Sequence, residues 1–323
     1  MKTAFITHPD CLKHDMGAHH PECPQRLAAI EHQLQATGLW SQLLRYESPL
    51  VDTAQLARVH TQSYIDSIRS AAPTSGLVAL DGDTAMNPFT LDAALRAAGA
   101  VVLATDLVMK REVDNAFCAV RPPGHHAESG RAMGFCVFNN VAVGVAHALQ
   151  HHQLSRVAIL DFDVHHGNGS EEIFHDDPQV MLCSTFQHPF YPYCGADSAN
   201  EHIINVPLQP GTDSSAFRNA VTDQWLPALH IFKPEMIFVS AGFDAHRDDD
   251  MAQLNLEDED YVWITREIRT IAEKYAQGRI VSVLEGGYEL KALGRCAAEH
   301  IRVLNADWLE ANLNVSRTAS NPE

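Results

Sequence analysis

The segment Ala158-Ile-Leu-Asp-Phe-Asp-Val-His-His-Gly-Asn-Gly169 places the strongest constraint on the fold of this chain. Four apolar residues, 157–160, lead into Asp161, and two glycines then interrupt the run. This pattern predicts a buried strand that ends in a turn carrying polar side chains. Ligands of open α/β sheets gather outside the carboxyl ends of the strands. The segment therefore predicts an α/β sheet with a functional site at one edge.

Asp163 and His165 stand two residues apart in this segment. Alternate side chains of an extended backbone lie on the same face, so this carboxylate and this imidazole can converge. Together they can hold a divalent metal ion. A helix-capping aspartate beside a hydrogen-bonded core histidine would give the same pattern. The motif alone leaves both interpretations open.

Strand-like and helix-like apolar patterns alternate along the rest of the chain. Strands are expected at 1–7, 115–120, 181–185, 203–206, 236–240 and 280–284. Helices are expected at 26–44, 61–72, 91–110, 139–151, 213–232, from 256 to Gly278, and in a closing segment that reaches about Trp308. This alternation predicts a mostly parallel sheet that is covered by helices on both faces. The loop 121–139 is too long for an ordinary connection, which indicates function.

Length and composition are compatible with one large domain. A chain of 323 residues with 46% hydrophobic content can bury a sizeable core. No linker or internal repeat divides the chain, so we expect a single domain over 1–323, with 314–323 as a loose tail. The short apolar run near the N-terminus is too short for a signal peptide or a membrane helix.

Charge and cysteine usage narrow the partners and the compartment. The formal net charge is -18, from 23 basic and 41 acidic residues. This balance argues against nucleic acid or an anionic membrane as the main partner and suits a cationic or neutral substrate. Seven cysteines without a Cys-x-x-Cys pair indicate free thiols in a reducing compartment, so a cytoplasmic location is expected. A monomer and a homo-oligomer are both compatible with the sequence.

Four glycine-containing loops that follow predicted strands carry unusual chemistry. They are Arg121-Pro-Pro-Gly-His-His-Ala-Glu128, Asp161–Gly169, Ser240-Ala-Gly-Phe-Asp-Ala-His246 and Glu285-Gly-Gly-Tyr288. Glycine allows the backbone to bend sharply or to approach a ligand closely. Each motif alone has an ordinary structural explanation. Their occurrence at successive strand ends favours one shared functional site.

The sequence resembles the histone deacetylase family, more closely its class II and bacterial histone deacetylase-like amidohydrolase branch. The resemblance rests on the four loops together with His20-Pro-Glu-Cys-Pro-Gln-Arg26 and Gly134-Phe-Cys-Val-Phe-Asn-Asn140, all in the family's order. It spans nearly the whole chain. It implies the arginase-deacetylase fold, a three-layer αβα arrangement around a mostly parallel sheet of about eight strands.

The resemblance implies a metal centre and assigns its ligands. Asp163, His165 and Asp244 match the family's zinc ligands. Two carboxylates, one imidazole and an open position for water fit a catalytic zinc site, and iron(II) or cobalt(II) fit the same donors. The family also has a structural potassium ion. Main-chain oxygens would hold this ion around Asp161, Asp163, His165, Ser184 and Thr185.

The catalytic residues also follow from the resemblance. His125 and His126 match the tandem catalytic histidines, with Asp161 paired to the first and Asn168 to the second. Class I members have Asp in place of this Asn; a neutral partner should raise the pKa of His126 less, making it a readier base. His126 would take a proton from a water that zinc activates. Tyr288 would donate a hydrogen bond to the developing oxyanion.

Substrate-contacting positions are carried over from the family in the same way. They correspond to Phe135, Tyr191, Phe190, Asp83, Met251 and Gly287. Phe135 and Tyr191 are expected to form the two walls of an acyl-lysine tunnel, with Phe190 as the alternative second wall. Asp83 is expected either to grip the substrate backbone at the rim or to serve only as a turn residue. Met251 lies where polyamine-specific relatives carry an acid, which disfavours acetylpolyamines.

The leading hypothesis is a zinc-dependent deacetylase that acts on acetyl-lysine in a protein or peptide. An acetylpolyamine and a small acyl amide or ester are alternative substrates. A dimanganese ureohydrolase of the same fold needs additional bridging aspartates, and Val164 and His166 flank His165 here instead. The non-enzymatic alternative is a module that binds acetyl-lysine without hydrolysing it. Intact His125, His126 and Tyr288 argue against this alternative.

Overall fold

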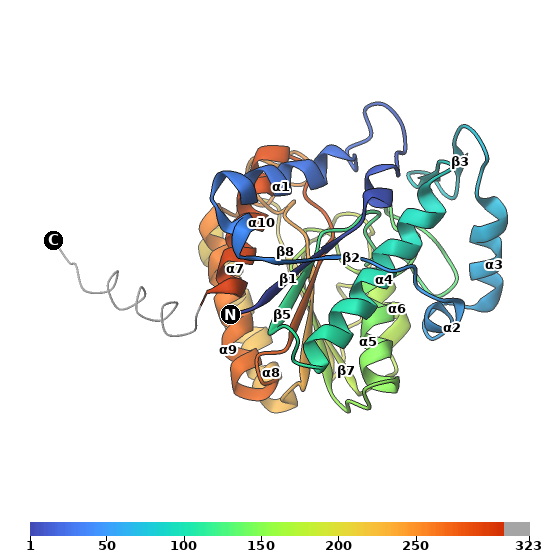
Figure 1. The fold of residues 1–323 in the computed structure, drawn as a ribbon. Helices are drawn as coiled ribbons and strands as arrows, with labels where there is room; N and C mark the ends of the chain where they lie inside the picture. The colour runs from blue at the N-terminus through green and yellow to red at the C-terminus, as the bar shows by residue number, and fades with distance from the viewer. Residues whose placement is uncertain (307–323) are drawn as a thin grey trace.

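All eight strands of the central sheet run parallel in the computed structural model, which describes residues 1–306 (Figure 1). The strands are β1 (Thr3–Thr7), β2 (Leu44–Glu47), β5 (Asn115–Cys118), β6 (Val157–Asp161), β7 (Val180–Gln187), β8 (Ile203–Leu208), β9 (Met236–Ala241) and β10 (Ile280–Leu284). Their order across the sheet is β2-β1-β5-β10-β9-β6-β7-β8. The predicted parallel α/β sheet of about eight strands is confirmed.

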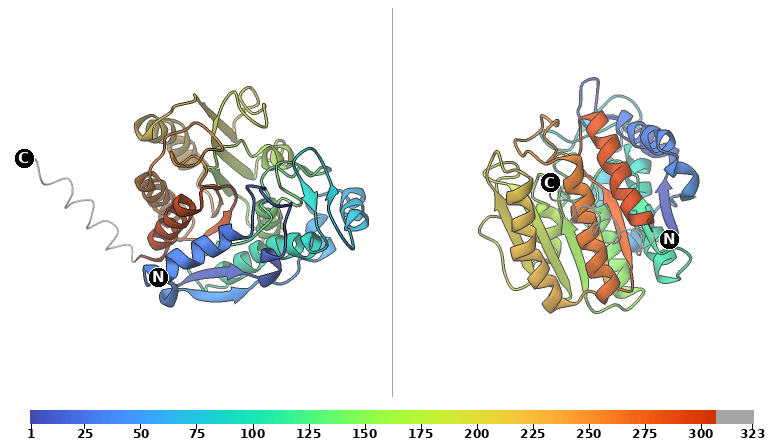
Figure 2. Two further views of the ribbon diagram at one scale, coloured as in Figure 1. Left: turned by 90° about the horizontal axis from the view of Figure 1, so that it is seen from above. Right: turned by 90° about the vertical axis from the view of Figure 1, so that its left-hand side faces the viewer.

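Helices cover both faces of this sheet (Figures 1 and 2). They are α1 (Gln25–Ala36), α2 (Thr53–Leu56), α3 (Gln62–Ala71), α4 (Thr90–Met109), α5 (Asn140–Gln150), α6 (Asn168–Phe174), α7 (Ser214–Ala220), α8 (Leu226–Phe232), α9 (Asp258–Tyr275) and α10 (Leu290–Asn305). Helices α4 and α5 pack together on one face, and α1, α10 and α9 pack in succession on the other. Two 3₁₀ helices (Pro9–Leu12, Leu39–Gln42), a π-helical turn (Val221–Trp225) and a small hairpin of β3 (Val78–Ala79) and β4 (Ala85–Met86) complete the elements.

The interior strands are apolar along their length because both of their faces are buried. Every residue of β5, β6, β7, β9 and β10 is buried. The edge strand β2 is different, since three of its four residues are exposed. Burial on two faces explains why the interior strands could be recognised as continuous apolar runs.

Three predicted helices differ from the structure. The helix expected at 26–44 ends at Ala36, because Gly38 adopts a left-handed conformation with φ of 72° that stops the helix. Strand β2 follows; it is only four residues long and mostly exposed, and its first residue, Leu44, fell within the predicted helix. The helix expected at 213–232 contains the π-helical turn. The closing helix ends at Asn305, and Trp308 and the expected tail at 314–323 lie outside the described residues.

The topology brings the four motif-bearing loops to one edge of the sheet. Strands β5, β10, β9 and β6 are consecutive neighbours in the sheet and all run in the same direction. The loops that follow them begin near residues 119, 285, 242 and 162. Because these are all carboxyl ends, the loops lie side by side, as expected for ligand sites of parallel sheets.

His300, in the helix layer behind β10, is a buried histidine that the fold keeps neutral. Its Nδ1 lies 2.7 Å from Thr265 Oγ1 and its Nε2 lies 2.8 Å from Ser282 Oγ. The Thr265 hydroxyl already donates to the carbonyl of Tyr261, so His300 Nδ1 donates to Thr265 and Nε2 accepts from Ser282. Burial lowers the pKa of His300 to about 3.

This histidine should make stability depend on pH. Because the folded pKa lies below the unfolded value, the unfolded state binds more protons as pH falls below about 6.5. We expect acidification from about pH 7.5 to about pH 5 to remove about 2 kcal/mol of unfolding free energy through His300. Urea unfolding of the parent and of His300→Gln at both pH values measures this. The variant should lose less stability on acidification; an equal loss in both proteins would contradict the assignment.

Candidate active site

Asp163, His165 and Asp244 form a buried cluster at the carboxyl edge of the sheet. Asp163 and His165 follow β6, and Asp244 follows β9. His165 Nδ1 lies 3.0 Å from Asp163 Oδ1 and 3.2 Å from Asp244 Oδ2. One candidate ligand atom from each residue lies within 4.8 Å of the others. The structure thus brings together three residues that are up to 81 positions apart in the sequence.

The surroundings of this cluster fit a divalent cation. Asp244 Oδ2 is buried, and His165 Nδ1, 3.2 Å away, is poorly aligned to donate a hydrogen bond to it. The backbone of Gly286 passes so close that a Cβ there would lie 2.0 Å from Asp244 Oδ2 and 2.6 Å from Asp163 Oδ2. Two carboxylates and an imidazole are the donor set of catalytic zinc sites. A buried carboxylate oxygen without a well-aligned hydrogen-bond donor, beside a second carboxylate, is a position that a metal ion would satisfy.

The two carboxylates of the cluster need positive charge beside them. Burial and the charge of Asp163 raise the pKa of Asp244 to about 6. Burial opposes a charge on His165, but its polar contacts with the carboxylates of Asp163 and Asp244 outweigh burial and raise its pKa to about 10. Two carboxylates in such a place cannot both ionise without a compensating positive charge.

His125 belongs to a second charged pair behind the cluster. Its Nδ1 lies 2.9 Å from Asp161 Oδ2. Burial alone would lower the pKa of His125, but the charges of Asp161 and Asp163 outweigh burial and raise this pKa to about 10. Glu285 Oε2 accepts hydrogen bonds from the backbone N–H groups of Gly124 and His125, at 2.7 and 3.1 Å. The loop after β10 therefore fixes the position of the tandem histidines.

His126 differs from its neighbour because its partner is neutral. Asn168 Nδ2 donates to Glu128 Oε1 at 2.8 Å, which directs its Oδ1 toward His126. That oxygen lies 2.8 Å from His126 Nδ1, so Nδ1 carries the proton and Nε2 keeps its lone pair. Burial, together with the charges of His125 and His165, lowers the pKa of His126 well below its usual value. The geometry makes His126 Nε2 a proton acceptor.

A cavity of about 150 Å³ opens onto this site. Its lining residues are Asp83, His126, Gly134, Phe135, His165, Phe190, Tyr191, Met251 and Tyr288. The ring of Phe190 stacks on His165 at a centroid distance of 5.6 Å, and the ring of Tyr191 meets His126 edge-on at 5.2 Å. Phe135 meets Tyr288 edge-on at 6.0 Å. Aromatic rings thus form the walls and imidazoles the base.

Two of the positions carried over for substrate contact have additional or different partners. Asp83 lines the cavity, but its Oδ1 also accepts hydrogen bonds from Gly134 N at 3.2 Å and from Thr84 Oγ1 at 3.0 Å. Gly287 is not among the described residues that line the cavity. Its carbonyl accepts a hydrogen bond from Arg26 Nε at 2.7 Å, and its φ of +118° is one that favours glycine. Gly287 therefore shapes the turn that carries Tyr288.

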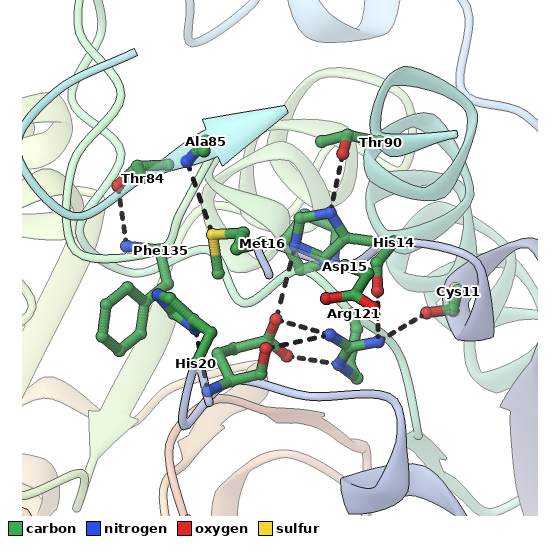
Figure 3. A network of polar contacts seen from close by, with 12 residues as sticks. Cys11, His14, Asp15, Met16, His20, Thr84, Ala85, Thr90, Arg121 and Phe135 are labelled. Atoms are coloured by element: carbon green, nitrogen blue, oxygen red, sulfur yellow. Dashed lines mark hydrogen bonds and ion pairs between the residues drawn. The ribbon is translucent and has the colours of Figure 1, made fainter. Parts of the chain in front are cut away.

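Buried charges near the N-terminus support this turn. The Arg26 guanidinium lies 4.9 Å from the ring centroid of Tyr288, and Glu22 Oε1 accepts from Arg26 Nη1 at 3.1 Å. Glu22 also pairs with Arg121. Figure 3 shows that Arg121 in turn donates to the carbonyls of Cys11 and His14. Arg26 and Glu22 belong to a motif that carries the family resemblance. The role of Arg26 was missed because it depends on contacts more than 250 positions away in the sequence, and that of Glu22 because its partner Arg121 is 99 positions away.

Asp249 is a third residue whose role the sequence did not indicate. Its Oδ2 accepts hydrogen bonds from the backbone N–H groups of Tyr288 and Glu289, at 2.6 and 2.9 Å. Its Oδ1 accepts from Met251 N at 3.1 Å. Asp249 therefore links the loop after β9 to the turn that presents Tyr288. Within an acidic run, Asp248 to Asp250, nothing in the sequence distinguished it from a solvated surface carboxylate.

Comparisons with known proteins match nearly the whole chain. The family model described as Histone deacetylase domain matches residues 20–304. A probable deacetylase of Archaeoglobus fulgidus is 36% identical over 299 residues, covering 90% of this chain and 82% of that protein. A histone deacetylase-like amidohydrolase of Pseudomonas aeruginosa is 34% identical over 328 residues, covering 94% and 86%.

Structural comparison agrees with these sequence matches. The crystal structure of the HDA15 HD domain superimposes with a TM-score of 0.89 at 30% sequence identity. The match covers 100% of this chain and 99% of that chain. The arginase-deacetylase fold expected from the resemblance is thereby confirmed. The chain belongs to the histone deacetylase family.

Proposed function

We propose that this chain is a zinc-dependent deacetylase that hydrolyses the amide of an acylated primary amine and releases acetate. Acetyl-lysine in a protein or peptide is the proposed substrate. The observation that carries the proposal is the aromatic cavity that ends at His126, His165 and Tyr288. Membership of a family of deacetylases and amidohydrolases supports hydrolysis as the reaction class.

The metal would be held by Asp163, His165 and Asp244. Zinc bound there supplies Lewis-acid polarisation of the acyl carbonyl and lowers the pKa of a water molecule; iron(II) or cobalt(II) suit the same donors. His126 Nε2 accepts the proton of the attacking water and later delivers a proton to the leaving amine. His125, kept charged by Asp161, stabilises the negative charge that develops nearby.

Tyr288 completes the proposed machinery as a hydrogen-bond donor. Burial raises the pKa of Tyr288 well above its usual value, although Arg26 opposes the shift. Its hydroxyl therefore stays protonated at working pH and can donate to the oxyanion. Arg26, Gly287 and Asp249 hold the backbone and ring of this tyrosine in place.

The cavity walls favour a slim, uncharged acyl-lysine chain. Phe135 and Tyr191 are the proposed walls, and Phe190 extends the apolar surface beside His165. Flat rings suit a run of methylene groups. Met251, which also lines the cavity, offers no charge to a second amine, so acetylpolyamines are the less favoured substrate. A small acyl amide or ester is the other alternative.

The remaining proposals concern the setting of the enzyme. All seven cysteines are free, which supports a reducing compartment such as the cytoplasm. Among residues 1–306, no helix is both long enough and apolar enough to span a bilayer. We propose a single catalytic domain, a structural potassium ion near β6 and β7, and no role for nucleic acid or membrane as partner.

Metal removal tests the proposed function. Treatment with a chelator should abolish hydrolysis of a fluorogenic acetyl-lysine peptide, because the proposed reaction depends on bound zinc. Added zinc should restore the activity. A hydroxamate inhibitor serves as the control for turnover at this site. Equal rates in stripped and untreated samples would contradict the proposal. Comparison of kcat/KM for the peptide, acetylputrescine and longer acyl chains would rank the substrate alternatives.

A further inference from the structure

A second group of metal-binding side chains lies at the opposite edge of the sheet from the active site. It consists of Asp106 near the end of α4 and of His147, His151 and His152 at the end of α5. One ligand atom from each lies within 4.8 Å of the others. Helix α5 begins beside the active-site loops and ends where the chain enters β6, so this cluster is remote from the catalytic residues.

Asp106 is the centre of this cluster. Its Oδ1 lies 2.9 Å from His147 Nε2 and 2.7 Å from His152 Nε2. His151 closes the group, because its ring lies 4.7 Å from that of His147 and 4.8 Å from that of His152, centroid to centroid. The backbone N–H of His151 donates to the backbone carbonyl of His147, so these two histidines form an i,i+4 pair on one helical turn.

Arg58 determines which of these histidines is free to bind an ion. Its Nη1 lies 2.8 Å from His147 Nδ1, and an arginine can only donate. His147 therefore carries its proton on Nε2 and donates it to Asp106. Coordination through Nε2 would move that proton to Nδ1, directly against Arg58. His147 therefore orients the Asp106 carboxylate through a hydrogen bond, as residues that hydrogen-bond to metal ligands do. Among the described residues, no arginine restricts the ring nitrogens of His151 and His152 in this way.

We propose that Asp106, His151 and His152 form a second metal site, which binds a borderline divalent transition-metal ion such as Zn²⁺. Two imidazoles and one carboxylate are the donors that such ions prefer. His151 is exposed and His152 and Asp106 are half-buried, so an ion can reach the site from solution. A bound ion would join the end of α5 to α4, two helices that pack against each other.

Zinc titration of the loaded enzyme tests this site. Tag-free, zinc-loaded protein is freed of loose metal and titrated with Zn²⁺ in a calorimeter at about pH 7.5, where neutral imidazole binds the ion. The parent should take up one more equivalent per chain than the double variant His151→Ala/His152→Ala. His151 is exposed and His152 is partly exposed, so the variant should fold. The added ion should also raise the thermal unfolding midpoint of the parent only.

His175→Ala provides the matched control. His175 is another surface histidine, with its Nδ1 3.0 Å from Asp176, and it lies outside the cluster. This variant should take up as much zinc as the parent. The proposal is overturned if the parent and the double variant take up equal amounts, or if His175→Ala loses the additional equivalent. Since the readout is the difference in metal uptake, the result is independent of deacetylase activity.

Discussion

Replacing Tyr288 with phenylalanine should lower kcat by about 10²–10³-fold while changing KM little, as expected when one oxyanion donor is removed. The substitution removes only the hydroxyl and keeps the ring that packs edge-on against Phe135 and near Arg26. The walls of the cavity therefore remain, so substrate binding should persist. Steady-state kinetics on an acetyl-lysine peptide, with zinc content measured in the same sample, would show the effect.

Tyr275→Phe is the matched control for this experiment. Its hydroxyl lies 3.1 Å from His230 Nδ1 at the surface end of α9, away from the cavity. Loss of this hydroxyl should leave kcat and KM at the parent values. If Tyr288→Phe turned over within a few-fold of the parent, the assignment of Tyr288 as the oxyanion donor would be wrong. A large rise in KM alone would instead indicate a role in substrate binding.

The sheet and its functional edge could be predicted because the relevant signals are local. Buried parallel strands such as β6 and β9 appear as apolar runs, and the polar residues that follow them mark their carboxyl ends. Since these ends share one edge of a parallel sheet, Asp163 and Asp244 are expected at the same edge, and the family resemblance brought them together as ligands of one ion. The family resemblance then supplied roles that spacing alone could not distinguish.

The parts that could not be predicted depend on contacts between distant segments. Arg26 reaches the backbone of Gly287 across 261 positions, and although it stands in a motif that carries the family resemblance, its sequence neighbours did not indicate this role. Strand β2, Leu-Arg-Tyr-Glu, is only four residues long, is mostly exposed and pairs with β1 at the sheet edge, so no buried apolar run marked it. Where a residue's role is to support a turn from another element, its own neighbours in sequence carry no signal.

Replacing Gly286 with alanine should abolish metal binding and, with it, activity. Its added Cβ would lie 2.0 Å from Asp244 Oδ2 and 2.6 Å from Asp163 Oδ2, where no real contact can exist. One carboxylate must therefore move out of the shared position. The backbone N–H of Gly286 also donates to Asp163 Oδ2 at 2.8 Å, so a shift of the loop would not relieve the clash without losing that bond. Metal content should fall from stoichiometric to near zero.

Gly130→Ala separates this effect from a general cost of adding a methyl group. A Cβ at Gly130 meets nothing within 4 Å, and this variant should keep the metal and the activity of the parent. Overpacking of this kind typically costs about 1–3 kcal/mol, less than the about 5–15 kcal/mol by which domains are stable. Gly286→Ala should therefore remain folded by circular dichroism while lacking zinc. A folded Gly286→Ala protein with full zinc content would show that Asp163 and Asp244 do not share one ion.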